Sequence, residues 1–347
     1  MTMNTLTIRR PDDWHLHLRD DDVMRAVLPA SARQFGRAIV MPNLKLPVTT
    51  AEAALAYRER IRAALPSDSP FTPMMTCYLC DASDPAEIRR GFESGAFAAA
   101  KLYPAGATTH SEYGVTSVDR IDQVLATMQD IGMPLLIHGE CTDPTVDVFD
   151  REAVFLRTTL MQILKRYPRL RVVLEHITTE DAADFVMRDE SGRLAATITP
   201  QHLMFNRNAM FTGGIRPHYY CLPVLKRKHH QQALRRAATS GSPAFFLGTD
   251  SAPHDTHAKE SACGCAGIFS APVALQAYLT VFEEERALPR FEAFASENGA
   301  RFYGVPLNEG SVTFHRTPTR VTGNVELEDG RRIQTLLAGE TLPWALA

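Results

Sequence analysis

Cysteine is scarce and scattered in this sequence. The six cysteines among 347 residues are spread along the chain, so we expect reduced thiols rather than a fold stapled by disulfides. Cys77 and Cys80 have the CxxC spacing of redox and zinc sites, but no second CxxC pair supplies the four ligands of a structural zinc ion. Residues 1–10 lack the apolar core of a secretory leader. We therefore expect a cytoplasmic protein.

The chain also lacks an excess of charge of either sign and an unbroken segment of membrane length. Lys and Arg total 37 against 40 Asp and Glu, a formal net charge of −3 with no basic block, which disfavours a nucleic-acid partner. Residues 261–282 carry no formal charge and are long enough to span a bilayer. Gly264, Gly267 and Pro272 interrupt this segment, which predicts a loop and a buried helix. We expect neither a membrane span nor a membrane partner.

Glycine motifs for nucleotides are missing as well, since neither GxGxxG nor GxxxxGK[ST] follows a strand candidate. Instead, short apolar runs alternate with amphipathic segments up to about residue 290. Strands buried on both faces of a parallel sheet have such continuous apolar runs. We count eight strand candidates, at residues 14–18, 37–41, 71–79, 97–101, 134–138, 171–176, 194–198 and 245–250.

Helical periodicity fills the intervals between these runs. Residues 48–65 and 121–131 have apolar residues at helical spacing, with Thr49 and Ser117 as expected N-caps. Eight βα repeats predict an α/β fold, a (β/α)8 TIM barrel, in one domain over residues 1–347. A doubly wound open sheet is the alternative. After residue 305 the periodicity is lost, and we expect a short irregular C-terminal appendage.

Polar side chains occupy the carboxyl ends of five strand candidates. Because these ends meet at the face of a barrel that carries the active site, we expect the side chains to converge. His15 and His17 are two residues apart, so both imidazoles point to one strand face and reach one ion. The full set of potential ligands is His15, His17, Lys101, His138, His176 and Asp250.

Each of these residues also has a plain structural explanation. A single histidine at a strand end is often a hydrogen-bonded core residue, and Asp250 could cap a following helix. Lys101 could extend to solvent from the barrel rim. Burial behind residues 97–100 would instead lower its pKa and expose a neutral amine, which takes up CO2 as a carbamate. As a set, the six residues predict a bound metal ion, because a buried cluster of imidazoles and carboxylates without one would be poorly compensated.

Seven segments resemble the amidohydrolase superfamily and, within it, the dihydroorotase family of the shorter bacterial class. They extend over residues 9–304, and the last forty or so residues add little. The segments are RPDDWHLHLR at 10–19, VMPN at 40–43, AKLYP at 100–104, IHGE at 137–140, LEHITT at 174–179, TPQHL at 199–203 and GTDSAPH at 248–254.

The resemblance implies a site with two zinc ions. The implied ligands are His15, His17 and Asp250 for one ion, and His138 and His176 for the other. N6-carboxylated Lys101 and a hydroxide are expected to bridge the ions, with Asp250 as general acid and base. The implied reaction is the reversible cyclisation of N-carbamoyl-L-aspartate to L-dihydroorotate in de novo pyrimidine (UMP) biosynthesis. A homodimer is implied as well.

Polar residues beyond the ligand set are expected to select the substrate. Arg19, two residues after His17, is suited to grip a carboxylate with its planar guanidinium, unless it only pairs with Asp20 at the surface. Asn43 and His254 follow strand ends and could share that carboxylate, although Asn43 could also merely form a turn. The resemblance supports Arg19, Asn43 and His254 and adds backbone contacts from two residues to the ring amide. The predicted substrate contacts are His17, Arg19, Asn43, His138, Leu222, His254 and Ala266.

Residues 104–114 are small and polar, which is typical of a mobile lid. The resemblance implies that Thr108 and Thr109 close over the substrate. Comparable family members have Asn in place of Gly106 and another polar residue in place of His110, so the ordered conformation of the lid is not given by the resemblance. A plain solvated loop is the alternative.

Three further cysteines, Cys221, Cys263 and Cys265, are expected to shape the glycine-rich loop around Ala266 rather than to bind metal. Two rival functions stay open. A related cyclic amidase such as a hydantoinase would use the same metals on another ring, and a non-catalytic amidohydrolase-like binding protein would have lost ligands. The complete ligand set and the predicted carboxylate contacts favour the dihydroorotase reaction.

Overall fold

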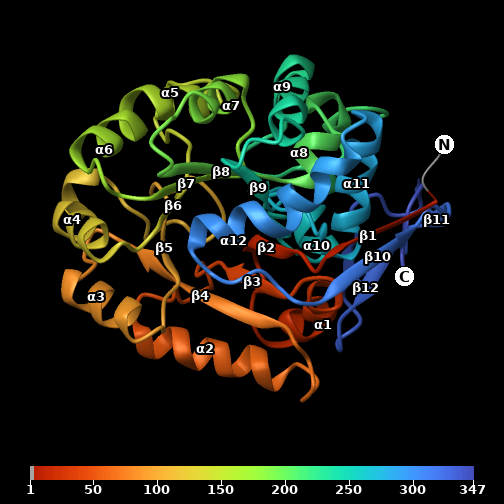
Figure 1. Ribbon diagram of the computed structural model, residues 1–347, viewed down its shortest axis with the longest axis horizontal. Helices are drawn as coiled ribbons and strands as arrows, with labels where there is room; N and C mark the ends of the chain where they lie inside the picture. Colours follow the sequence, from red (N-terminus) through yellow and green to blue (C-terminus); the bar gives the residue numbers. More distant parts are fainter. Residues whose placement is uncertain (1–3) are drawn as a thin grey trace.

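The structure is a computed structural model that describes residues 4–347. Its centre is a sheet of eight parallel strands whose order follows the chain. These strands lie in the middle of the molecule in Figure 1. The predicted (β/α)8 barrel is confirmed, with a strand at each predicted run. The strands are β2 (Asp12–Leu16), β3 (Arg37–Val40), β4 (Thr72–Leu79), β5 (Ala99–Leu102), β6 (Leu135–His138), β7 (Val172–Glu175), β8 (Leu194–Ile198) and β9 (Phe245–Leu247).

The barrel closes between β2 and the segment that follows β9. Leu16 and Ser251 form a parallel bridge there. The Asp250 N–H donates to the His15 carbonyl at 2.9 Å, and the His17 N–H donates to the Ser251 carbonyl at 3.1 Å. Closure therefore joins the first and last strands of the barrel at their carboxyl ends, where polar residues of both segments lie.

Helices cover the outside of the barrel (Figure 1). They are α1 (Asp21–Ala32), α2 (Ala51–Ala63), α3 (Pro85–Glu93), α4 (Asp122–Ile131), α5 (Arg151–Phe155), α6 (Met161–Arg166), α7 (Glu180–Met187), α8 (Pro200–Met204), α9 (Lys228–Ala238), α10 (Thr256–Lys259), α11 (Ala274–Glu284) and α12 (Asn298–Tyr303). Shorter 3-10 helices are η1 (Val118–Ile121), η3 (Arg207–Met210), η4 (Pro217–Tyr219), η5 (Ala271–Val273) and η6 (Leu288–Arg290), and π-helical turns are η2 (Leu156–Leu160) and η7 (Ala293–Glu297). Among residues 4–347, no helix has the length and apolar character that crossing a membrane requires.

The two expected N-caps have different outcomes. Ser117 accepts a hydrogen bond from the Asp119 N–H, as predicted, and caps η1. Helix α2 is capped by Thr50 instead of Thr49, because Thr50 has the extended backbone that brings its hydroxyl within 3.2 Å of the Ala53 N–H.

The chain after residue 305 is more regular than the irregular appendage that we expected. Strand β1 (Thr5–Arg9) pairs with β10 (Ser311–His315), which also pairs with β15 (Ala345–Leu346). Two further antiparallel pairs are β11 (Thr319–Arg320) with β14 (Thr341–Leu342), and β12 (Asn324–Glu326) with β13 (Arg332–Gln334). Strands this short give almost no alternation in a sequence. Residues from both ends of the chain thus share one small sheet beside the barrel (Figure 1).

Apolar side chains fill the barrel below its polar end. Ala99, Leu136 and Val173 belong to one buried cluster with Trp14. Trp14 in turn stacks on Tyr303 of α12 with ring centroids 4.4 Å apart. Since side chains two residues apart point the same way along a strand, the residues two positions further on also face the barrel interior. These residues are Lys101, His138 and Glu175.

Gly299→Ala should destabilise the protein although alanine is the better helix former. A Cβ at Gly299 would lie 2.0 Å from Nε1 of Trp14, whose ring is held by Tyr303. Overpacking of this kind costs about 1–3 kcal/mol, so the urea midpoint should fall. Gly323→Ala is the matched control, since its Cβ would have nothing within 4 Å. Equal midpoints for the two variants would contradict the expected clash.

Candidate functional site

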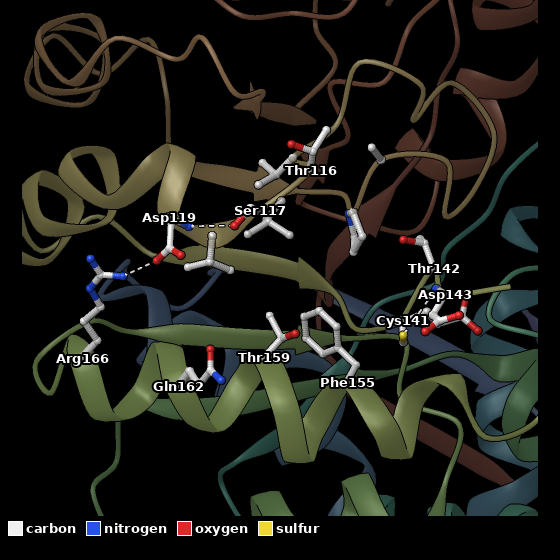
Figure 2. Close-up of a pocket in the computed structure, with 16 residues that line it drawn as sticks. Thr116, Ser117, Asp119, Cys141, Thr142, Asp143, Phe155, Thr159, Gln162 and Arg166 are labelled. Atoms are coloured by element: carbon white, nitrogen blue, oxygen red, sulfur yellow. Dashed lines mark hydrogen bonds and ion pairs between the residues drawn. The ribbon is translucent and has the colours of Figure 1, made fainter. Parts of the chain in front are cut away.

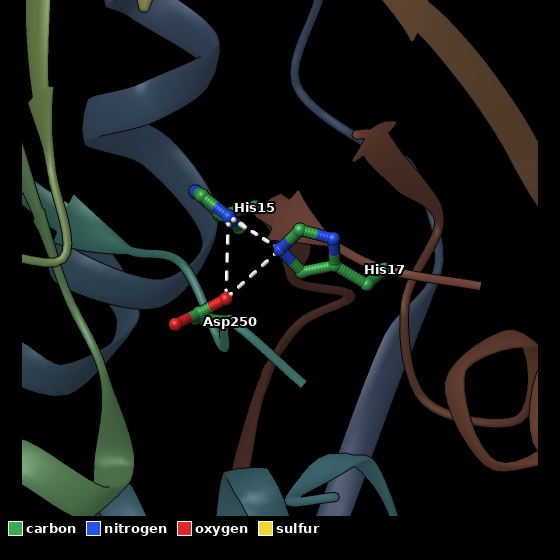
Figure 3. Close-up of side chains that lie close together, drawn as sticks. All are labelled: His15, His17 and Asp250. Atoms are coloured by element: carbon green, nitrogen blue, oxygen red, sulfur yellow. Dashed lines mark hydrogen bonds and ion pairs between the residues drawn. The ribbon is translucent and has the colours of Figure 1, made fainter. Parts of the chain in front are cut away.

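Three of the predicted ligands meet at the closure of the barrel, as Figure 3 shows. One oxygen of Asp250 lies 3.3 Å from Nε2 of His15 and 3.1 Å from Nε2 of His17. The two Nε2 atoms lie 3.1 Å from each other. All three side chains are buried, and their ligand atoms could all contact one ion.

The backbone explains why both histidines reach the same point. The pairing of β2 with β3 shifts register between Asp13 and Leu16, and a bulge of this kind redirects the side chains that follow it. In the segment after β9, which closes the barrel against β2 and is called the seam below, Asp250 has a φ of 44°. A positive φ is uncommon for a residue with a side chain and is often found at functional sites.

Buried Asp13 joins the two segments that close the barrel, and no pattern in the sequence marks it as part of the site. Its carboxylate accepts hydrogen bonds from the Thr249 N–H at 2.9 Å and the Thr249 hydroxyl at 2.6 Å. It also accepts from the His15 N–H at 3.2 Å. Burial raises the pKa of Asp13 to about 7, against the opposing effect of these hydrogen bonds. The only signal in the sequence was its position two residues before His15.

A second group of potential ligands contains a residue that the sequence analysis did not select. Glu175 joins His15 and His176 in this group, and one of its oxygens lies 3.0 Å from Nδ1 of His15. Its other oxygen forms a buried ion pair with Lys101. Glu175 faces the interior because it is two residues beyond Val173 on β7. His176 reaches the same space through a φ of 43° just after the strand ends.

His138 lies beside this group. Its ring centroid is 4.8 Å from that of His176. Nε2 of His138 lies 2.8 Å from one oxygen of Glu140, and both side chains are buried. The other oxygen of Glu140 is buried with no hydrogen-bond partner among residues 4–347. The six predicted ligands are therefore neighbours, although His138 is not in either group of close ligand atoms.

The buried position of these groups sets their charge. Burial lowers the pKa of His15 to about 3 and the pKa of His176 well below 6.5, so both imidazoles are neutral and keep a lone pair. Burial also lowers the pKa of Lys101 well below 10.5. Burial opposes ionisation of Asp250, but its close contacts with the rings of His15 and His17 hold its pKa well below 3.8.

This donor set suits a divalent metal ion. Nδ1 of His17 and Nδ1 of His176 are buried and form no hydrogen bond within residues 4–347, and Nδ1 of His15 has the Glu175 oxygen 3.0 Å away. Neutral imidazoles and carboxylates with unsatisfied lone pairs are the ligands that zinc and similar ions take.

One pocket contains eleven of the thirteen predicted site residues. They are His15, His17, Arg19, Asn43, Thr108, Thr109, His138, His176, Leu222, Asp250 and Ala266, and Tyr103, Ala252 and Gly267 complete the lining. The other two lie just outside the lining. Lys101 is fully buried beneath it, next to Glu175, and His254 lies behind Arg19 and Ala266.

Arg19 provides positive charge at this pocket. It has a φ of 61°, and its guanidinium contacts the Pro253 carbonyl at 3.2 Å and Nε2 of His254 at 3.0 Å. Its Nη1 is buried and has no hydrogen-bond partner among residues 4–347. The alternative surface pair does not form, because Asp20 pairs with Arg60 at 2.7 Å. A guanidinium in this setting is suited to an anionic ligand.

The predicted lid is folded down over the pocket. The Asn43 side-chain amide donates to the Thr109 carbonyl at 3.0 Å, and the Thr109 hydroxyl donates to the Ala266 carbonyl at 3.4 Å. Nδ1 of His110 lies 3.2 Å from the Asn43 carbonyl. Gly106 has a φ of 77°, a conformation that Asn also tolerates. These contacts hold residues 109 and 110 against Asn43 and Ala266 at the pocket.

A larger pocket lies beside the two ends of the predicted lid, and Figure 2 shows its lining. It is formed by Pro104, Ala105 and Val115 at the ends of the lid, by Glu140 and Cys141 after β6, and by side chains of α5 and η2 such as Phe155 and Thr159. None of the residues in the two groups of close ligand atoms lines it. Size therefore does not identify the functional pocket here.

The cysteines match the expectation of free thiols. All six are unpaired, and none belongs to a group of metal-ligand atoms among residues 4–347. Cys77 is buried with its thiol against the Thr49 carbonyl.

His202 is a hydrogen-bonded core residue, 2.6 Å from the Thr199 hydroxyl and 2.9 Å from the Pro223 carbonyl.

A buried cluster of imidazoles and carboxylates at the carboxyl ends of eight parallel strands defines a metal-dependent barrel enzyme. Residues 12–314 match the amidohydrolase family. The chain belongs to this family.

Close relatives within the family are dihydroorotases. The chain is 60% identical to the dihydroorotase of Klebsiella pneumoniae subsp. pneumoniae over 98% of this chain and 97% of the relative, and 60% identical to that of a Synechococcus species over 99% and 98%. A Campylobacter jejuni dihydroorotase structure has a TM-score of 0.90 at 34% identity, covering 100% and 98% of the chains. A Saccharomyces cerevisiae dihydroorotase in complex with 5-fluoroorotic acid has a TM-score of 0.91 at 28% identity, covering 99% of each. The chain is thus a hydrolase of the class that acts on cyclic amides.

Proposed function

We propose that this chain is a dihydroorotase that interconverts N-carbamoyl-L-aspartate and L-dihydroorotate in pyrimidine biosynthesis. The observation that carries the proposal is the position of Arg19. Its guanidinium lies in the same pocket as His15, His17 and Asp250 and keeps a buried N–H without a partner among residues 4–347. A cyclic amide with a carboxylate satisfies both parts of this pocket. The yeast relative was solved with 5-fluoroorotic acid, a pyrimidine ring that carries a carboxylate.

Two zinc ions fit the donor set. His15, His17 and Asp250 would hold one ion, and His138 and His176 the other, with N6-carboxylated Lys101 between them. The low pKa of the buried Lys101 amine favours the neutral form that reacts with CO2. When bound, such ions lower the pKa of a shared water and polarise the carbonyl of the substrate.

Asp250 is the proposed general acid and base. Its low pKa makes it a carboxylate at neutral pH, so in the hydrolytic direction it accepts a proton from the attacking water. It then gives this proton to the amide nitrogen that leaves the ring. The reverse sequence closes the ring: Asp250 removes a proton from the ureido nitrogen as that nitrogen attacks the side-chain carboxyl group. It then returns the proton to the carboxyl oxygen whose bond to carbon breaks, and this oxygen leaves as water.

The other pocket residues bind and enclose the substrate. Arg19 would form a paired hydrogen bond with the substrate carboxylate, assisted by Asn43 and His254. The backbone at Leu222 and Ala266 would bind the ring amide. Thr108 and Thr109, which already line the closed pocket, would exclude water from the reacting carbonyl. His17 and His138, which line the same pocket, would contact the ring.

We also propose the setting in which the enzyme works. The free thiols favour the cytoplasm. Residues 1–347 are proposed to act as one domain, because β1 near the start of the chain pairs with β10 near its end. A homodimer remains a proposal from the family resemblance.

The rival functions make different demands on the pocket. An L-hydantoinase from Arthrobacter aurescens shares the fold with a TM-score of 0.80 at 16% identity, and its fold alone does not specify a substrate. Arg19, with its unpartnered N–H, favours a carboxylated ring over the uncarboxylated rings of hydantoin and dihydrouracil. A non-catalytic binding protein would not need the complete set of buried metal ligands.

Purified protein should contain close to two zinc ions per chain and should hydrolyse dihydroorotate, because the ligand set provides for two ions. Elemental analysis and a dihydroorotate assay before and after chelation measure both properties. Restoration of activity by added zinc is the control for chelator damage. Full activity of a metal-free sample would contradict the proposed mechanism.

Arg19→Ala should lower kcat/KM for dihydroorotate by roughly tenfold to a hundredfold or more, since a charged hydrogen bond is lost. Zinc content should not change, because Arg19 is not a proposed ligand. Arg60→Ala is the matched control, as Arg60 is exposed and pairs with Asp20. Hydantoin and dihydrouracil, assayed in parallel, lack the carboxylate. Normal turnover of dihydroorotate by Arg19→Ala would show that this residue does not bind the carboxylate.

Glu140→Leu should weaken zinc binding, because Nε2 of His138 would lose the acceptor at 2.8 Å that orients its ring. Loss of such a partner typically costs about 10–100-fold in metal affinity. Competition with a chelator of known affinity measures the change without an activity assay. Glu140→Gln keeps an acceptor and should be affected less. Equal zinc retention in the wild type and Glu140→Leu would overturn this role.

A further inference from the structure

Lys259, the last residue of α10, is a buried charged residue outside the proposed metal site. Its side chain is almost completely buried. Nζ donates to the carbonyls of Tyr220 at 2.8 Å, Cys265 at 2.6 Å and Gly267 at 2.8 Å. An ammonium group has three donors, and here each donor has its own backbone acceptor. No ion pair joins Lys259 to a carboxylate within residues 4–347, so these carbonyls are its closest compensation.

The three carbonyls flank the proposed backbone contacts of the substrate. Tyr220 is two residues before Leu222, and Cys265 and Gly267 lie on either side of Ala266. The two loops also meet directly, since the Gly267 N–H donates to the Tyr220 carbonyl at 3.1 Å. Lys259 therefore cross-links the two loops from behind the pocket.

The loop that Lys259 holds also contacts the lid and the carboxylate-binding residues. The Ala266 carbonyl lies 3.1 Å from Nε2 of His254 and accepts from the Thr109 hydroxyl at 3.4 Å. Gly267 has a φ of 154°, and a Cβ there would lie 2.6 Å from the Ala252 carbonyl. The loop is thus packed too closely to shift without disturbing several pocket residues.

We propose that Lys259 is a positioning residue for the substrate, whose ammonium group fixes the backbone of both loops in the geometry that binds the ring amide. This inference rests on the proposed function. An apolar side chain of similar length would fill the space without the cost of burying an ammonium group. Lys226 gives a comparison within the chain, since it is buried but donates to one carbonyl only, that of Val224.

The charge of Lys259 depends on pH in an accessible range. Burial lowers the pKa of Lys259 to about 8. The groups that face it are the thiols of Cys221 and Cys265, the Tyr220 ring at 5.6 Å and His254, whose pKa burial lowers to about 2. Asp255 lies at the start of the same helix. Since Lys259 loses its proton as the pH rises through about 8, its three hydrogen bonds to carbonyls are complete only below that pH.

Substitution of Lys259 tests the inference in protein that has first been shown to hydrolyse dihydroorotate. Failure of the wild type in that assay would overturn the proposed function, whereas the comparison of variants addresses Lys259. Lys259→Met should raise KM for dihydroorotate by about tenfold, the effect of weakening one hydrogen-bonded contact, with a smaller change in kcat and no change in zinc content. Lys228→Met, at an exposed lysine of α9, is the matched control. A KM equal to that of the wild type would overturn the inference.

A second variant tests the positioning role of Lys259 even if Lys259→Met does not fold. Lys259→Arg keeps a positive charge that does not titrate in this range. In the wild type, KM should increase above about pH 8 as Lys259 loses its proton. In Lys259→Arg this increase should be absent, whatever its KM at neutral pH. The same increase above pH 8 in both proteins would assign it to another group and overturn the role of Lys259.

Discussion

The closure of the barrel between β2 and the segment after β9 is the contact on which the site depends. The hydrogen bonds between the two backbones at His15, His17, Asp250 and Ser251 complete the sheet. The same residues supply the first group of metal-ligand atoms. Asp13 fixes the register of this seam through Thr249. Fold stability and ligand geometry are therefore determined together, and a change that loosens the seam should also separate the ligands.

Much of this arrangement could be predicted because it follows from short-range rules. Continuous apolar runs predicted all eight strands. Because the carboxyl ends of those strands converge, the positions of Lys101 and His138 at strand ends predicted that their side chains lie close together. The unpredicted features depend on backbone geometry that has no simple sequence signal. Glu175 and His176 both stand at the end of β7, and only the inward direction of Val173 two residues earlier distinguishes Glu175 as the side chain that the strand turns inward. His176 enters the site only through its positive φ.

The distant contacts around the substrate could not be predicted from local patterns at all. Asp13 and Thr249 are 236 positions apart in the chain, and neither occurs in a pattern that marks the pairing. The contacts of Lys259 require the fold to bring three backbone carbonyls to one point. Backbone acceptors occur at every residue, so a sequence does not distinguish those that a buried ammonium group will find. The short strands after residue 305 failed to stand out for a related reason, because too few residues alternate in each.

Glu175 also bears on the charge balance of the proposed site. In the structure it pairs with the unmodified Lys101, and carboxylation of that lysine would replace a potential cation with an anion. That change would turn a contact between opposite charges into one between two anions, which is costly in a medium of low polarity unless positive charge lies beside them. Glu175 shares a group of close ligand atoms with His15 and His176, so a metal ion held there would supply that positive charge. Glu175 thus ties the charge state of Lys101 to the occupancy of the proposed site.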